Sequence, residues 1–271
     1  MILLWIMSVC RIAKIKNILR CLVIVCVVTG CKPPGEPALI IATSANMQFA
    51  MEALSSGFYE EYGIQPQIVC GSSSKLTAQI RAGAPFDIFI SADMVYPLAL
   101  YKDGLAESEP LEYARGQLVL WTLTEDSLVT LDNLCYAGTQ YIAIANPQTA
   151  PYGKAAIQIL ENYGIWDKVE SKLVYAESIS QVSQFVLSGA ADYGFIARSI
   201  VSSPEVAGKG CWISLDSTLY APIRQGAVLL KKKDGKHPDS KLFMKFLFSD
   251  HAGAILKNYG YIVSHRGEED E

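Results

Sequence analysis

A run of three serines, Ser72–Ser74, follows a short apolar segment that ends at Gly71. Leu76 and Ile80 come next at helical spacing, so the pattern predicts a strand, a turn and a helix. Free N–H groups at a helix start and the helix dipole favour an anion, and serine hydroxyls add donors. These residues therefore suggest anion binding without a cation. A plain serine N-cap explains the same pattern, and both interpretations stay open at this point.

A serine in this run could instead be a nucleophile, which requires a base such as histidine within reach. The three histidines, His237, His251 and His265, come late in the chain and outside the loops that follow the predicted strands. The sequence GSSSK also differs from the GxSxG pattern of a nucleophile elbow. A serine-dependent enzyme is the weaker interpretation.

The serine run is one of four places at which a helix opens after a strand. The four helix starts are Asn46, Ser73, Tyr152 and Ile179. At Asn46 the hydrophobic spacing changes from strand to helix, which makes Asn46 a candidate N-cap. Strands that alternate with helices predict an α/β fold with a mostly parallel sheet covered on both faces. Ligands of such folds bind outside the carboxyl ends of the strands, so the four helix starts are expected to converge around one small anion.

The composition allows a sizeable core, because 51% of the 271 residues are hydrophobic. The length suits one large domain or two α/β lobes. Residues 1–30 hold four Lys and Arg and no acidic residue, so the remainder has 19 basic and 27 acidic residues and a net charge of −8. This charge argues against nucleic acid as a partner. Residues 266–271 form an acidic tail that is expected to be solvated and disordered.

Residues 1–30 are predicted to be a signal peptide for export. A basic region precedes an apolar run that is too short to span a membrane comfortably. Small residues before Cys31 resemble a bacterial lipobox, in which Cys31 would be the lipidated first residue of the mature lipoprotein, carrying palmitate or a similar chain. Residues 31–37 would then tether the domain to the membrane. An ordinary membrane anchor and an uncleaved signal are the alternatives, and translation starts at either Met1 or Met7.

Three further cysteines, Cys70, Cys135 and Cys211, remain in the predicted domain. Their odd number and the lack of a CxxC spacing predict neither a disulfide scaffold nor a zinc site. Cys70 is expected to be a buried apolar residue at the end of a strand. One disulfide between two of the three stays open.

Four motifs in the chain resemble the substrate-binding proteins of bacterial ABC transporters for molybdate and tungstate. They are ATSANMQFAMEAL, GSSSKLTAQIRAGAPFDIFISAD, ANPQTAPYGKAA and AESISQVSQFVLSGAADYGFIA. The resemblance implies a type II periplasmic-binding fold, in which two α/β lobes are joined by a hinge that the chain crosses twice. Lobe one would comprise residues 38–118 and 226–265, and lobe two residues 119–225. The crossovers would lie at the strands that begin at Gln117 and Ile223.

The resemblance also implies how the ligand is held, namely by hydroxyls and backbone N–H groups in the cleft and by no cation. By position in the motifs, Asn46 and Ser73 would be contacts from lobe one, and Tyr152 and Ile179 would be backbone N–H contacts from lobe two. Some relatives add a tyrosine hydroxyl where this chain has Ala197. That fifth contact would be missing here or supplied by the Tyr152 hydroxyl.

The function implied by the resemblance is that of a monomeric, lipid-anchored receptor and not of an enzyme. It would capture molybdate or tungstate outside the cytoplasmic membrane and deliver it to a permease. No cofactor and no direct metal ligand are implied, because molybdenum is bound as its oxyanion.

Sulfate, phosphate, ferric iron or an amino acid are alternative ligands. Amino-acid sites usually offer an Arg, and iron sites need Tyr and His clusters. Neither feature is evident at the four helix starts. A further alternative is the effector domain of a transcriptional regulator. Such a protein would have a DNA-binding helix-turn-helix, and in this chain the predicted export signal occupies that place.

Overall fold

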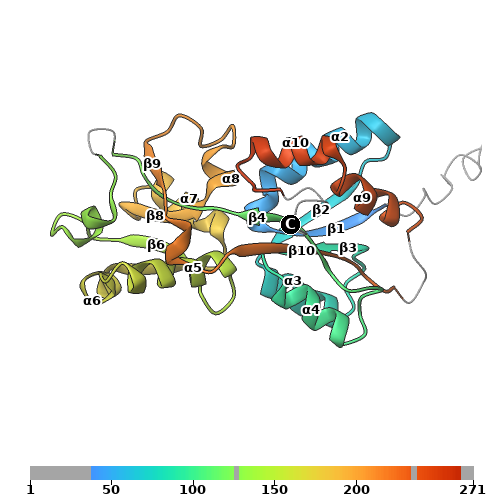
Figure 1. The fold of residues 1–271 in the computed structure, drawn as a ribbon, viewed down its shortest axis with the longest axis horizontal. Helices are drawn as coiled ribbons and strands as arrows, with labels where there is room; N and C mark the ends of the chain where they lie inside the picture. The colour runs from blue at the N-terminus through green and yellow to red at the C-terminus, as the bar shows by residue number, and fades with distance from the viewer. Residues whose placement is uncertain (1–37, 125–127, 233–236, 264–271) are drawn as a thin grey trace, which may run out of the picture. The chain divides into compact units, whose positions relative to one another are not determined.

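The computed structural model describes residues 38–124, 128–232 and 237–263. The predicted signal peptide, the tether and the acidic tail lie outside these ranges. Within them the chain folds into two five-stranded sheets with helices packed against them (Figure 1). No helix in this part of the chain combines the length and the apolar character that crossing a membrane requires.

The first sheet has the strand order β2-β1-β3-β10-β4. Its strands are β1 (Ile40–Ser44), β2 (Gln67–Gly71), β3 (Ile88–Ile90), β4 (Leu111–Gly116) and β10 (Ile223–Leu229). The helical elements of this lobe are η1 (Ala45–Met47), α2 (Gln48–Tyr62), α3 (Ser73–Arg81), α4 (Val95–Lys102), α9 (Ser240–Leu247) and α10 (Asp250–Asn258). Helices α2, α9 and α10 cover one face of the sheet, and α3 and α4 cover the other (Figure 1). Because side chains of a strand alternate between faces, Ile41 joins the core under α2 and Ala42 the core under α3.

The second sheet has the strand order β7-β6-β8-β5-β9. Its strands are β5 (Leu118–Thr122), β6 (Ile142–Ala145), β7 (Leu173–Ala176), β8 (Tyr193–Ala197) and β9 (Cys211–Ser214). The helical elements of this lobe are η2 (Leu131–Cys135), α5 (Pro151–Asn162), α6 (Trp166–Val169), η3 (Glu170–Lys172), α7 (Ile179–Leu187), α8 (Arg198–Val201) and η4 (Ser217–Leu219). One continuous core that includes Trp121 and Phe195 fills this lobe.

Two adjacent stretches of chain connect the lobes. Only Gln117 separates β4 of the first sheet from β5 of the second, and the chain returns through β10. Ile223, the first residue of β10, pairs with Gly116, the last residue of β4. The two connections therefore lie side by side, as in a hinge with two crossovers. The residue limits given above for the lobes stay a prediction, because strand pairing assigns strands and not the limits of a lobe.

Parallel pairing is less frequent than predicted. Four of the eight strand pairings are antiparallel: β10 with β3 and β4, and β5 with β8 and β9. The prediction of a mostly parallel sheet was therefore wrong. The antiparallel pairs all involve β5 or β10, the strands that follow a crossover, and these strands are not part of a strand–helix–strand unit.

Cys70 differs from the prediction as well. Its side chain is exposed, because β2 is an edge strand in which no residue is fully buried. The expectation of a buried apolar cysteine was wrong. Cys70 and Cys135 are free thiols, so no disulfide joins two of these three cysteines.

Candidate functional site

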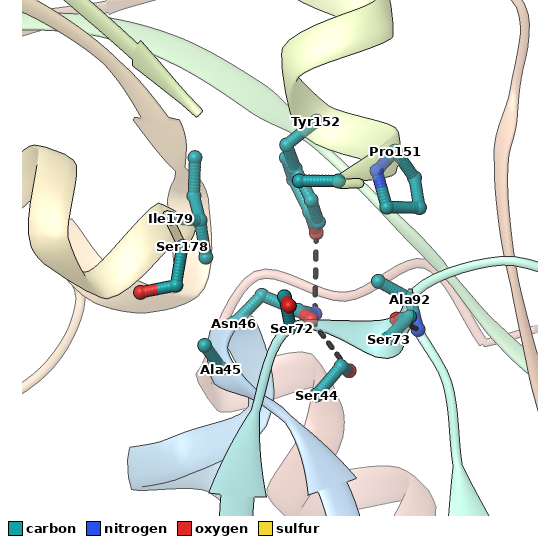
Figure 2. A pocket seen from close by; sticks show the side chains of 11 residues that line it. Ser44, Ala45, Asn46, Ser72, Ser73, Ala92, Pro151, Tyr152, Ser178 and Ile179 are labelled. Carbon is teal, nitrogen blue, oxygen red and sulfur yellow. Dashed lines mark hydrogen bonds between the residues drawn. The ribbon is translucent and has the colours of Figure 1, made fainter. Parts of the chain in front are cut away.

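A single pocket brings the four predicted helix starts together. The pocket lies at the ends of strands from both sheets and is partly open to solvent, and its empty space, with the open part included, is about 230 Å³. Figure 2 shows Asn46, Ser72 and Ser73 approaching from the first lobe and Tyr152 and Ile179 from the second. All lining residues have neutral side chains: Ser44, Ala45, Asn46, Ser72, Ser73, Ala92, Ala150, Pro151, Tyr152, Ser178 and Ile179.

Ser73 opens α3 and offers two donors. The N–H groups of a helix's first turn have no intrahelical acceptor, and the Ser73 N–H is one of them. The Ser73 hydroxyl oxygen accepts a hydrogen bond from the Ala92 N–H at 3.1 Å, so its own proton is left to donate. Ser72 holds the N-cap position of α3 but its side chain makes no capping hydrogen bond. The Ser72 hydroxyl is thus a further donor in the pocket.

The position of Asn46 in its helix and the hydrogen bonds of its side chain differ from the prediction. It is the middle residue of η1, whose N-cap is Ser44, so the prediction of Asn46 as an N-cap was wrong. Asn46 Nδ2 lies 3.0 Å from Gln225 Oε1, 2.8 Å from Tyr261 Oη and 3.4 Å from Tyr152 Oη. Asn46 Oδ1 accepts a hydrogen bond from Ser44 Oγ at 2.7 Å. Both side-chain hydrogens are engaged by these acceptors, so a contact of Asn46 with an anion would come from its main-chain N–H.

Tyr152 carries the first N–H of α5. The helix begins at Pro151, which has no N–H, and Tyr152 is the next residue. The Tyr152 hydroxyl is buried and accepts a hydrogen bond from Gln225 Nε2 at 3.0 Å. Burial raises the pKa of Tyr152 well above its usual value, so the phenol stays neutral. The Tyr152 hydroxyl points toward Asn46 (Figure 2), and Ala197, although buried, is not among the residues that line the pocket.

Ile179 is the first residue of α7. Its side chain is buried in the core of the second lobe, which leaves the main-chain N–H as its polar group at the pocket. The preceding Ser178 is the N-cap, and its hydroxyl accepts a hydrogen bond from the Gln181 N–H at 3.3 Å. In Figure 2 this hydroxyl is directed away from Ser73 and Asn46. The contact of the Ile179 N–H with the ligand stays a prediction.

Direct hydrogen bonds between the lobes surround the pocket. Ser180 Oγ of the second lobe donates to the Ala45 carbonyl oxygen at 3.0 Å. Ser199 Oγ donates to the Asn46 carbonyl oxygen at 2.7 Å. Neither serine was singled out in the sequence, because each contacts a residue more than a hundred positions away. These bonds fix the η1 backbone against the second lobe.

The two aspartates near the serine helix have structural roles. Asp87 Oδ2 accepts a hydrogen bond from the Ile40 N–H at 2.8 Å, and Asp87 Oδ1 pairs with Lys232 Nζ at 2.6 Å. Asp93 Oδ1 accepts a hydrogen bond from the Tyr96 N–H at 3.2 Å. Neither carboxylate lines the pocket. These contacts indicate that both aspartates have structural roles.

The fold and the pocket together define a binding protein for a small solute. Two α/β lobes with two crossovers enclose neutral donors at the starts of helices, which suits a ligand that is held without a counter-ion. Over residues 39–262 the chain matches the family of bacterial extracellular solute-binding proteins, and it belongs to that family.

The individual proteins to which the chain is similar include molybdate-binding proteins. The molybdate-binding protein ModA of Rhodobacter capsulatus is 34% identical over 232 residues, which are 85% of this chain and 90% of the relative. ModA of Azotobacter vinelandii is 36% identical over 228 residues, which are 82% of this chain and 88% of the relative. The solved structure of the Azotobacter vinelandii periplasmic molybdate-binding protein superposes with a TM-score of 0.78 at 34% identity, covering 83% of this chain and 99% of that chain.

These similarities confirm the two-lobed periplasmic-binding fold that the resemblance implied. The relatives are exported binding proteins and not enzymes. The serine-dependent enzyme is therefore no longer a competing interpretation.

Proposed function

We propose that this protein is the receptor of an ABC transporter for molybdate or tungstate. It binds the oxyanion in the pocket between the lobes and delivers it, as a monomer, to a permease in the cytoplasmic membrane. The lobes that hold the ligand comprise residues 38–118 with 226–265 and residues 119–225. The molybdate-binding proteins that are 34% and 36% identical to the chain support this assignment of the ligand.

The observation that carries the proposal is the convergence of η1, α3, α5 and α7 on one pocket without a charged side chain. A buried dianion needs a donor for every oxygen, because its desolvation is costly. Main-chain N–H groups at helix starts supply such donors with little loss of side-chain entropy. The proposed donors are the N–H groups of Asn46, Tyr152 and Ile179 and the N–H and hydroxyl of Ser73.

The test of the proposal is calorimetric titration of the full chain, purified in mild detergent, with molybdate, tungstate and sulfate. We expect one-to-one binding of molybdate and tungstate and no heat from sulfate, because donors spaced for a large tetrahedral oxyanion hold a smaller one poorly. Binding of sulfate alone would move the assignment to that ion. No heat with any of the anions would contradict the proposed function.

The lipid anchor is a separate part of the proposal, and Cys31 lies outside the described residues. The small residues that precede Cys31 in the sequence support it, together with the family's extracellular location. We expect Cys31→Ser to move the protein from the membrane fraction to the soluble extracytoplasmic fraction, since a single lipid-modified residue is the only anchor proposed.

A matched control for the anchor is Cys70→Ser, because Cys70 is an exposed free thiol of the folded domain. This variant should remain in the membrane fraction. If Cys31→Ser fractionates with the membrane as the unaltered protein does, the lipid anchor is wrong while the ligand assignment is untouched.

A further inference from the structure

A buried polar cluster lies behind the pocket at the crossover between the lobes. We call it the hinge cluster, and its members are Asn46, Tyr113, Tyr152, Gln225 and Tyr261. At most 4% of each of these residues is exposed. They come from η1, β4, α5, β10 and the segment after α10, so the cluster joins both lobes.

Gln225 makes hydrogen bonds to three other members of the hinge cluster. Its Oε1 accepts hydrogen bonds from Asn46 Nδ2 at 3.0 Å and from Tyr113 Oη at 2.8 Å. Its Nε2 donates to Tyr152 Oη at 3.0 Å. The side chain of Gln225 therefore uses its acceptor and its donor together, and two of its three partners are proposed ligand contacts.

Two backbone features direct Gln225 into the cluster. The register between β10 and β4 shifts between Gln225 and Gly226, and such bulges change the direction of a side chain. Gly116 on β4 leaves room for the contact, because a Cβ at this position would collide with Tyr152 Oη and Gln225 Nε2. The register shift and the absence of a Cβ at Gly116 thus coincide with the contact between the Gln225 carboxamide and the Tyr152 hydroxyl.

We infer that Gln225 is a positioning residue of the oxyanion site, which holds Asn46 and Tyr152 so that the N–H groups of η1 and α5 face the ligand together. This inference rests on the proposed function. In the observed arrangement a neutral carboxamide, which both donates and accepts, satisfies all three partners. An ionised glutamate accepts but does not donate, and it adds a negative charge near the bound anion.

The titratable groups that face Gln225 stay neutral in the test. They are the phenols of Tyr113 and Tyr152, with Tyr261 reached through Asn46, and burial raises the pKa of all three above the usual value. The neighbouring Arg224 pairs with Glu112 outside the cluster. A new pH dependence in a Gln225→Glu variant would therefore report the introduced carboxyl group.

The test compares Gln225→Glu with the unaltered full chain in detergent by molybdate titration at about pH 6.5 and about pH 9. Burial raises the pKa of a glutamate, and its protonated form mimics glutamine by donating and accepting. We expect about tenfold weaker binding at the higher pH and recovery of most of the affinity at the lower pH. The matched control is Gln158→Glu, whose side chain accepts a hydrogen bond from Ala221 N–H and lies outside the cluster. The control should bind like the unaltered protein at both values.

The outcomes of these titrations decide the inference. Wild-type affinity of Gln225→Glu at both pH values, or a loss of affinity that does not recover at the lower pH, overturns it. If Gln225→Glu does not fold, the Tyr152→Phe variant tests the inference instead. It keeps the main-chain N–H of residue 152 and removes only the hydroxyl to which Gln225 donates a hydrogen bond. Several-fold weaker binding of a folded Tyr152→Phe supports the inference, and unchanged binding overturns it. Failure of the unaltered protein to bind molybdate would instead reject the proposed function.

Discussion

Replacing Ser73 by alanine is expected to weaken molybdate binding by about 1–3 kcal/mol, which is about 5- to 150-fold in Kd. The Ser73 oxygen is held by the Ala92 N–H, so its hydroxyl proton is oriented before the ligand arrives. Alanine removes this donor and leaves one oxygen of a buried dianion without a partner. Titration calorimetry of Ser73→Ala and of the unaltered protein measures the difference.

The control for Ser73→Ala is Ser203→Ala. Ser203 is fully buried, donates to the Ile200 carbonyl oxygen at 2.6 Å and does not line the pocket. Both variants lose a buried hydroxyl and are expected to lose similar thermal stability, but only Ser73→Ala should lose affinity. Equal affinities of the two variants would remove Ser73 from the site.

The four helix starts could be predicted from the sequence because each has a local signal. Short polar residues or a Pro follow an apolar strand, and helical spacing begins within a few residues. In an α/β fold this pattern also predicts that the helix starts lie at one edge of a sheet. The structure places Asn46, Ser73, Tyr152 and Ile179 around one pocket, although their role in binding stays a prediction.

The hinge cluster could not be predicted, because its contacts join distant parts of the chain. Asn46 meets Tyr152, Gln225 and Tyr261 across 106, 179 and 215 positions. Tyr113 lies in β4, whose apolar pattern is interrupted by charged residues, so the sequence gives no clear signal for this strand. Local spacing can identify Asn46 as a residue at a helix start. It does not reveal that the Asn46 side chain is engaged and that only the main-chain N–H is left for a ligand.

The direction of the crossover strands relative to their neighbours could not be predicted from the sequence either. The sequences of residues 118–122 and 223–229 both predict apolar strands. An apolar strand has the same residue pattern whether it pairs parallel or antiparallel with its neighbours. The two crossovers followed from the family resemblance and not from the spacing. The antiparallel pairings of β5 and β10 with their neighbours come from those crossovers.

Replacing Gly153 by alanine is expected to destabilise the fold by about 2–3 kcal/mol and to weaken oxyanion binding as well. Gly153 follows Tyr152 in the first turn of α5, and a Cβ there would collide with the Ala145 carbonyl at the end of β6. The obstacle is backbone, so the start of α5 must move away from the strand. This movement displaces the Tyr152 N–H from the pocket. We expect thermal unfolding about 4–12 °C lower, measured by calorimetry.

The sign of this effect is informative, because alanine favours a helix over glycine by about 1 kcal/mol when nothing obstructs it. Gly138→Ala is the matched control, since a Cβ at Gly138 meets no atom within 4 Å. It should leave both the unfolding temperature and the affinity nearly unchanged. If Gly153→Ala were as stable as the unaltered protein, α5 would have room to shift on β6. Unchanged affinity with lowered stability would instead mean that the Tyr152 N–H does not contact the ligand.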